Sequence, residues 1–170
     1  MPKLIKYTIF RTNSGYFTLA GTKTALHRTL LPTPNAKEAE NQIRNIYQAP
    51  QYQKDYFKPL QQKIKTYYQG SYTDFTTYPP IEICGSQFTQ KVLKACRKIT
   101  YAQTTTYQQL AKQANSAKAA RTAGTVMANN PLPLIIPCHR IIKSNGETGA
   151  FSAGQGTTAK KMMLTLEKKV

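Results

Sequence analysis

Residues 130–142 read Asn-Pro-Leu-Pro-Leu-Ile-Ile-Pro-Cys-His-Arg-Ile-Ile. Two apolar runs enclose a thiol, an imidazole and a guanidinium, which belong to Cys138, His139 and Arg140. We expect a strand here. A purely structural strand would not contain His139 and Arg140, because each buried polar group without a partner costs about 1–3 kcal/mol. A thiolate is a nucleophile, and a neighbouring cation lowers the pKa of a free thiol from about 8.5 toward neutrality. The segment therefore predicts a reactive cysteine at Cys138, with an inert buried thiol as the alternative.

The other two cysteines, Cys84 and Cys96, are expected to be inert. The three cysteines form no C-x-x-C pair, and an odd number cannot all be paired within one chain. Free thiols are typical of a reducing compartment, so we expect a cytoplasmic protein. The chain has only two histidines, His27 and His139, and lacks the close-spaced ligands of a structural zinc site. We expect neither a metal nor another cofactor.

Two short helices are predicted upstream of this segment. The first follows residues 105–108, where Thr precedes Gln by three residues, the spacing of a capping box, and it should end near Asn115. Ser116 can cap a second helix over residues 117–128, so that a very short turn joins the two, as in a helix-turn-helix unit. Because short helix pairs are common in α-rich domains, spacing alone is weak evidence for DNA binding.

The second of these helices is rich in small residues: Ala119, Ala120, Ala123 and Gly124. Such a helix can pack tightly in a core. On a basic protein it can also approach a nucleic-acid groove that longer side chains would block. The composition of the helix leaves both interpretations open.

The N-terminal part predicts a small α+β unit. The first 30 residues alternate as strands do, with a turn at residues 13–15 that indicates a hairpin. Helical spacing of apolar residues follows after Pro34 and again before Gly70.

A linker is predicted over residues 71–83, where Tyr78-Pro79-Pro80 interrupts any helical period. After it, a helix is expected whose apolar stripe consists of Phe88, Val92, Leu93 and Cys96. We expect an N-terminal α+β domain with its linker over residues 1–80 and a mainly helical C-terminal domain over residues 81–170.

The composition narrows the class of partner. The 170 residues include 24 Lys and Arg against 7 Asp and Glu, a net charge of +17, and 40% hydrophobic residues. This apolar content argues against disorder, and the spread of the charge predicts a folded basic surface that binds a polyanion, with nucleic acid first and a membrane surface as the weaker alternative. No apolar run approaches the roughly 18 residues that span a bilayer, and residues 1–6 contain no apolar core of a signal peptide.

The motif Pro137-Cys138-His139-Arg140-Ile141, preceded by Asn130-Pro131, resembles the active-site signature of the O6-alkylguanine-DNA alkyltransferases. The resemblance extends over roughly residues 85–167, about half the chain. Further matching positions are Gly85, Phe88, Thr106, Tyr107, Leu110, Ala111, Ala119, Ala120, Arg121, Gly124, Met127, Ser144, Gly146, Gly149 and Gly154. It implies an α+β fold, with a small N-terminal α+β domain followed by a helical domain that carries a winged-helix-like helix-turn-helix unit.

The resemblance also implies roles for individual residues. Cys138 would accept the alkyl group from guanine O6 and form a thioether, so that each molecule works once. His139 would remove the thiol proton through a water, and Glu167, in a helix expected over residues 160–169, would orient the imidazole. Tyr107 would donate a hydrogen bond to the flipped guanine. The pocket would contain Met127, Phe151, Ser152, Asn130 and Arg140, of which the last two hold the site together by hydrogen bonds.

The DNA-contacting residues implied by the resemblance belong to the helix pair. Arg121 would enter the minor groove and take the place of the flipped base. The neighbouring contacts would come from Ala119, Ala120, Thr106 and Ser116. The partner would be double-stranded DNA with an alkylated guanine, O4-alkylthymine being a second candidate substrate, and the protein would act as a monomer.

Two other functions stay open. A non-enzymatic protein that binds alkylated DNA would share the fold but lack the reactive cysteine, so Cys138 argues against it. A thiol hydrolase or peptidase that uses Cys138 and His139 is disfavoured because neighbouring residues on a strand project to opposite faces.

Overall fold

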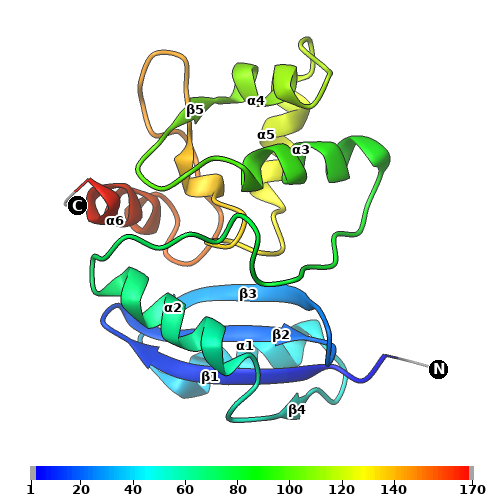
Figure 1. Cartoon of the computed structure of the whole chain (residues 1–170), viewed down its shortest axis with the longest axis vertical. Coiled ribbons are helices and arrows are strands. Elements are labelled where there is room, and N and C mark those ends of the chain that lie inside the picture. Colours follow the sequence, from blue (N-terminus) through cyan, green and yellow to red (C-terminus); the bar gives the residue numbers. More distant parts are fainter. Residues whose placement is uncertain (1–2, 169–170) are drawn as a thin grey trace.

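A computed structural model describes residues 3–168 of the chain. The N-terminal part is a four-stranded sheet in the order β3-β2-β1-β4, with a helix on each face (Figure 1). Its strands are β1 (Lys6–Thr12), β2 (Gly15–Gly21), β3 (Leu26–Thr33) and β4 (Gln51–Tyr52). The predicted hairpin of β1 and β2 is confirmed. Gly15 lies at its turn with φ +121°, and a Cβ there would collide with the carbonyl oxygen of Thr33.

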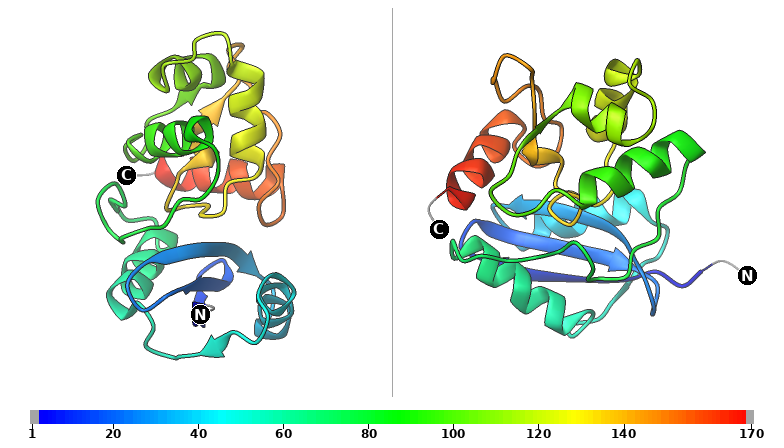
Figure 2. Two further views of the ribbon diagram at one scale, coloured as in Figure 1. Left: turned by 90° about the vertical axis from the view of Figure 1, so that its right-hand side faces the viewer. Right: turned by 45° about the horizontal axis from the view of Figure 1, so that its top comes forward.

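The two helices of this domain, α1 (Ala36–Ile46) and α2 (Lys58–Tyr68), confirm the helical spacing in the sequence. Asn35 caps α1, since its side chain accepts a hydrogen bond from the Glu38 backbone N–H. One face of the sheet packs on Ile43 of α1, and the other face packs on α2 (Figure 2).

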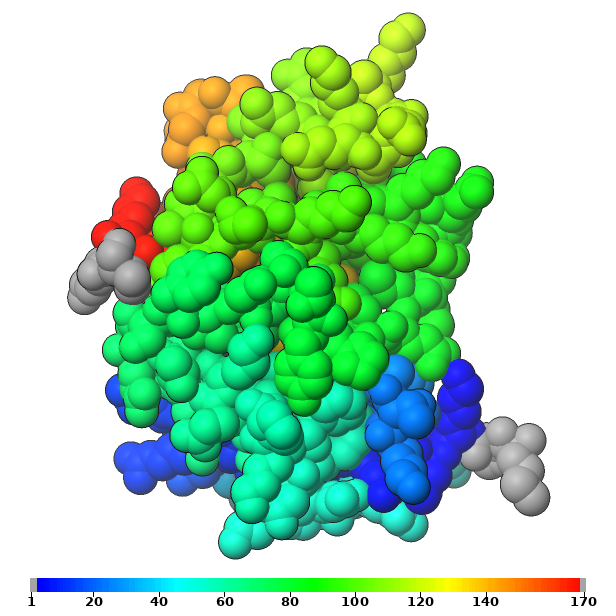
Figure 3. Space-filling model, in the orientation of Figure 1, coloured from blue at the N-terminus to red at the C-terminus, as the bar shows by residue number. Residues whose placement is uncertain are grey.

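The predicted linker is irregular, yet it packs against both halves of the molecule. Ile81 forms a β-bridge with Leu26 of the N-terminal sheet. Arg97, at the end of α3 (Gln87–Arg97), donates hydrogen bonds to the carbonyl oxygens of Phe75 and Pro79. The division between residues 80 and 81 therefore stays a prediction. On the face shown in Figure 3, the linker and α3 cover the junction between the two domains, above α2.

The C-terminal domain contains the expected helix α3 and the expected helix pair, α4 (Tyr107–Gln113) and α5 (Ala120–Ala128). A capping box precedes α4, but Thr106 and Gln109 form it, one residue later than the 105–108 pair. The prediction that Ser116 caps the second helix is wrong. Its carbonyl oxygen accepts a hydrogen bond from Ala119 N–H in a turn, so that α5 begins at Ala120 rather than at residue 117.

The segment around Cys138 is a single 3-10 turn, η1 (Cys138–Arg140), so the expected strand is wrong there. The turn is closed by a hydrogen bond from Arg140 N to Pro137 O at 2.9 Å. A strand of two residues, β6 (Ile141–Ile142), follows and pairs in parallel with β5 (Thr105–Thr106). The final helix, α6 (Thr157–Glu167), begins three residues before the predicted start, and Lys169, its predicted end, lies outside the described residues.

One continuous apolar cluster extends through both domains. It includes Leu26 and Ile64 from the N-terminal domain and Leu93, Leu110 and Ile135 from the C-terminal domain. The predicted fold class, an α+β domain followed by a helical domain with a helix-turn-helix unit, is confirmed. Within residues 3–168, every helix is too short or too polar to cross a membrane.

Candidate active site

Cys138 lines an open pocket of about 1020 Å³ in the C-terminal domain. Only 3% of the residue is exposed to solvent. Helix α5, the first residue of α4 and the loop after β6 form the walls. The lining residues are Tyr107, Ala120, Arg121, Gly124, Thr125, Met127, Ala128, Cys138, Lys143, Ser144, Gly149, Ala150, Phe151 and Ser152.

Asn130 contacts the sulfur directly. Its Nδ2 donates to the carbonyl oxygen of Ile136 at 2.8 Å and to Cys138 Sγ at 3.1 Å, and its Oδ1 accepts from Leu132 N at 3.0 Å. The Asn130 side chain thus links the turn of residues 130–136 to the sulfur of Cys138. We expected only a structural role from Asn130, whereas in this geometry its amide also donates a hydrogen bond to the Cys138 sulfur.

His139 and Glu167 form a buried pair, with His139 Nε2 2.7 Å from Glu167 Oε1. Both side chains are almost fully buried. His139 Nδ1 is also buried and has no hydrogen-bond partner among residues 3–168. The carboxylate therefore fixes one ring nitrogen and leaves the other available to a water.

Arg140 is the second partner of the Glu167 carboxylate. Its Nε and Nη2 donate to both oxygens of Glu167, at 3.0 and 2.9 Å, and its Nη1 donates to the carbonyl oxygen of Ile99 at 2.6 Å. Tyr67 from α2 donates a further hydrogen bond to Glu167 Oε1 at 2.9 Å. Arg140 was expected in the pocket, but it faces Glu167 and is absent from the pocket wall. Its predicted function in holding the site together by hydrogen bonds agrees with this geometry.

The protonation states follow from burial. Burial raises the pKa of the Cys138 thiol to about 11, and the hydrogen bond from Asn130 only partly opposes it. The expectation that the neighbouring His and Arg bring this pKa toward neutrality is therefore wrong, because Arg140 is paired with Glu167. Burial also lowers the pKa of His139, which keeps the imidazole neutral at pH 7.

Glu167 shows the opposite balance. Burial by itself would raise its pKa, but the hydrogen bonds from His139 and Arg140, together with the positive charge of Arg140, outweigh burial and lower the pKa to about 2. The site thus combines a protonated thiol, a neutral imidazole and an ionised carboxylate.

Lys160 is a charged residue near the site that sequence reasoning missed. It is fully buried in α6, donates to the carbonyl oxygen of Ile141 and lies 5.8 and 5.7 Å from the ring centres of Tyr107 and Phe151. Burial lowers its pKa to about 8. One signal existed in the sequence, since Lys160 lies at helical spacing from the buried residues Met163 and Glu167.

Tyr107 lies against the pocket with its hydroxyl beside Gly149. A Cβ at Gly149 would lie 3.5 Å from the Tyr107 Oη, and one at Gly124 would lie 3.8 Å from its ring. Burial raises the pKa of Tyr107, and the nearby Cys138 raises it further, so the phenol keeps its proton. Gly124 thus faces the pocket, a position that sequence alone did not distinguish from a groove contact.

The predicted pocket residues Met127, Phe151 and Ser152 do line this pocket, and Ser152 Oγ bonds to the carbonyl oxygen of Ala128. Arg121 and Ala120 line its rim on α5, and Arg121 is exposed. The other predicted DNA-contacting residues lie elsewhere on the helix pair: Thr106 and Ala119 are the N-cap residues of α4 and α5, and Ser116 lies in the turn between the helices.

The other cysteines and the second histidine lie outside this pocket. Cys96 is buried in α3 and Cys84 is exposed. His27 lies 3.0 Å from Glu82. Within the described range, no three His, Cys, Asp or Glu side chains are close enough together to hold a metal ion.

Comparison with known proteins matches almost the whole chain. Residues 5–82 match the family model of the 6-O-methylguanine DNA methyltransferase, ribonuclease-like domain, and residues 87–169 match that of its DNA-binding domain. A methylated-DNA–protein-cysteine methyltransferase from Cricetulus griseus is 32% identical over 179 residues, which cover 96% of this chain and 82% of the relative.

Solved structures agree with these sequence matches. The crystal structure of a Mycobacterium tuberculosis O6-methylguanine methyltransferase is similar with a TM-score of 0.80 and 26% identity, covering 98% of this chain and 94% of that one. A second structure from the same organism, described as a complex with DNA, has the same TM-score and identity and covers 96% and 93%.

Proposed function

Since the chain belongs to the 6-O-methylguanine DNA methyltransferase family, we propose that it repairs DNA by moving the alkyl group of O6-alkylguanine onto its own Cys138. The observation that carries this assignment to particular residues is the contact of the buried Cys138 with Asn130 beside the His139–Glu167 pair, at a pocket formed by the second helix of the helix-turn-helix unit.

The reaction is a displacement at the alkyl carbon. The Cys138 sulfur forms a bond to this carbon while the carbon–oxygen bond breaks, and the electron pair of that bond passes to the guanine. The thiol is protonated at rest, so a base must take its proton, and His139 Nδ1 does so through a water. The ionised Glu167 stabilises the imidazolium that forms.

The leaving guanine becomes more basic as the bond breaks. Tyr107, whose phenol stays protonated, donates a hydrogen bond to it and neutralises the developing charge. The product on Cys138 is a thioether, which water does not cleave, so each protein molecule acts once.

The substrate base must leave the double helix to reach the pocket, at a cost of a few kcal/mol. Helix α5 contacts the minor groove, and Arg121 at the rim of the pocket fills the position of the flipped base. The partner is double-stranded DNA that contains an alkylated guanine, and the protein acts on it as a monomer. Its free thiols fit the reducing conditions of the cytoplasm.

The test is to incubate the protein with a duplex oligonucleotide that carries O6-methylguanine and to measure the mass of the peptide that contains Cys138. One added methyl group is expected in the wild type and none in Cys138→Ser. Cys84→Ser, which removes the exposed thiol, should be methylated at Cys138 like the wild type. Tight binding of the oligonucleotide without any methylated peptide would instead indicate a lesion-binding protein without catalytic activity.

A further inference from the structure

One edge of the N-terminal sheet is bonded to the turn that precedes Cys138. In the strand order β3-β2-β1-β4, β3 is an edge strand. Its outer edge first bonds to the linker, where Leu26 N donates to Pro80 O at 2.9 Å. Three residues later, Thr29 N donates to Pro131 O at 3.0 Å.

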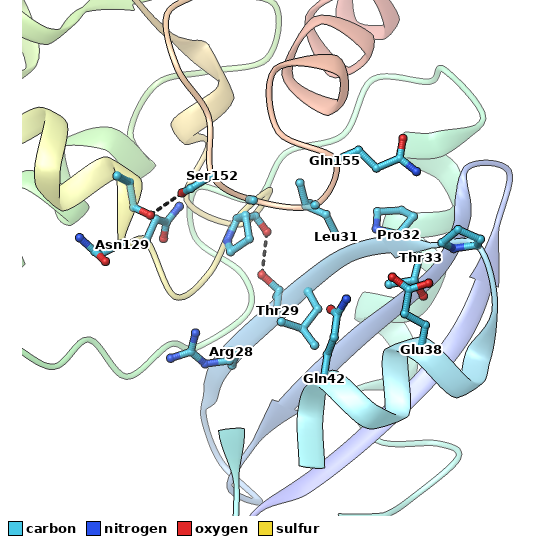
Figure 4. A pocket seen from close by; sticks show the side chains of 17 residues that line it. Arg28, Thr29, Leu31, Pro32, Thr33, Glu38, Gln42, Asn129, Ser152 and Gln155 are labelled. Atoms are coloured by element: carbon cyan, nitrogen blue, oxygen red, sulfur yellow. Dashed lines mark hydrogen bonds between the residues drawn. The ribbon is translucent and has the colours of Figure 1, made fainter. Parts of the chain in front are cut away.

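Thr29 makes a second bond to the same turn. Its hydroxyl donates to the carbonyl oxygen of Pro133 at 2.7 Å, and the residue is 1% exposed. Figure 4 shows this bond from β3 to the turn, beside a groove of about 580 Å³ between the domains. One residue therefore holds two carbonyl groups of the turn in place.

Few backbone N–H groups of the turn, residues 130–136, donate hydrogen bonds within the turn itself. Pro131 and Pro133 have no N–H to donate. Leu134 has φ +76°, a conformation that costs free energy for any residue except glycine. Within the turn, Leu132 N is held by Asn130 Oδ1 and Ile136 N by Leu132 O. Such a strained loop persists only when its surroundings hold it.

The same turn positions the donor to the reactive sulfur, because Asn130 bonds at once to Ile136 O and to Cys138 Sγ. We propose that Thr29 is a positioning residue for alkyl transfer, which fixes the 130–136 turn from the N-terminal domain so that Asn130 stays on Cys138. This inference rests on the function proposed above, and it assigns the N-terminal domain a part in the reactivity of the site.

The first test is Thr29→Val, which removes the hydroxyl and nearly keeps the shape of the side chain. The rate constant for methyl transfer to Cys138 from an O6-methylguanine duplex should fall by about tenfold, the effect of losing one buried hydrogen bond. Thr29→Ser restores the hydroxyl and should restore the rate. If Thr29→Val does not fold, Thr29→Ala removes the same hydroxyl and carries the same expectation.

The matched control is Thr18→Val in the neighbouring strand β2. Thr18 is fully buried, and its hydroxyl has no hydrogen-bond partner within residues 3–168. Thr18→Val should therefore react at the rate of the wild type, although it changes the same chemical group in the same sheet.

A second readout needs no DNA and separates positioning from stability. The reaction of Cys138 with iodoacetamide is followed against pH in a Cys84→Ser background. Because the Asn130 hydrogen bond lowers the pKa of the thiol, a loosened turn should shift the profile to higher pH by about half a unit or more in Thr29→Val and not in Thr18→Val.

Equal transfer rates and equal pH profiles in Thr29→Val and the wild type would overturn the inference. So would an equal loss in Thr18→Val, or a failure of Thr29→Ser to restore the rate. If the wild type itself were not methylated, the proposed function would fail, while the iodoacetamide profile would still decide the role of Thr29.

Discussion

At the scale of single residues, the acceptor thiol and its base have complementary protonation states. Burial keeps the Cys138 thiol protonated, with a pKa of about 11, and the same burial keeps His139 neutral. A free thiolate at pH 7 would be rare, so the proposed reaction depends on transfer of the thiol proton to His139 as the bond to carbon forms.

This arrangement predicts a particular dependence of rate on pH. In the wild type, the reaction with free O6-benzylguanine should be level between about pH 7 and 9, because the pKa of His139 lies below its ordinary value. In His139→Ala the rate should be lower and should rise about tenfold per pH unit toward the pKa of the thiol. Mass spectrometry of the Cys138 peptide over time measures both profiles. His27→Ala, which changes the histidine outside the pocket, should behave as the wild type, and a wild-type rate that rises in parallel with that of His139→Ala would contradict the mechanism.

Glu167 links the site to stability in acid. Its pKa falls from 4.5 to about 2 on folding. A carboxyl group with a lowered folded pKa stabilises the fold above about pH 4.5, and this stabilisation, on the order of 3 kcal/mol, is lost as the pH falls toward about 2. Glu167→Gln should be less stable at pH 7 and should lose less of its free energy of unfolding in acid than the wild type.

Urea denaturation between about pH 3 and 7 measures this difference. The control is Glu147→Gln, because Glu147 is exposed and its ion pair with Lys143 lies in solvent, where such pairs contribute little. It should follow the wild type across the range. Equal losses in acid for Glu167→Gln and the wild type would show that this carboxylate is not the linked group.

At the scale of elements, α5 lines the pocket, and in the proposed function it also contacts the DNA. Ala120, Gly124 and Met127 line the pocket along one side of the helix, and Arg121 lies exposed at its rim. The composition of α5 left tight packing and groove entry as alternatives. The geometry supports a combined explanation, since Gly124 makes room beside Tyr107 while Arg121 stays free to contact DNA.

Arg121→Ala should slow the repair of O6-methylguanine in a duplex by about tenfold or more and leave the reaction with free O6-benzylguanine almost unchanged, because only the duplex reaction requires base flipping. Lys118→Ala, at another exposed basic residue just before α5, is the control for a general loss of charge and should affect the duplex reaction less. Equal losses on duplex and free base in Arg121→Ala would exclude the flipping role.

At the scale of the whole molecule, the net charge of +17 predicts electrostatic binding to the phosphates of DNA that does not depend on base sequence. The affinity for an unmodified duplex should fall by about 100-fold between about 50 and 200 mM salt, equally for different sequences. Fluorescence anisotropy measures it. The reaction with free O6-benzylguanine, which involves no phosphate, is the control and should barely change. An affinity that is independent of salt would mean that the basic surface does not bind the backbone.

Local signals in the sequence predicted most of the secondary-structure elements, the family and the reactive cysteine of this protein. The spacing of apolar residues located the hairpin, α1, α2 and α3, because burial of one face imposes a period on the chain. The motif around Cys138, together with spaced matches such as Tyr107, Arg121 and Glu167, indicated the family and the acceptor.

Only the folded chain decided how these groups act on one another. Thr29 and Pro133 are 104 positions apart, and the Tyr67–Glu167 contact spans 100. The protonated state of Cys138, the buried amine of Lys160 and the 3-10 turn at Cys138 likewise depend on which distant segments pack together. Residue spacing encodes local periodicity and chemistry, whereas burial and the hydrogen bonds between remote segments exist only after the two domains form one core.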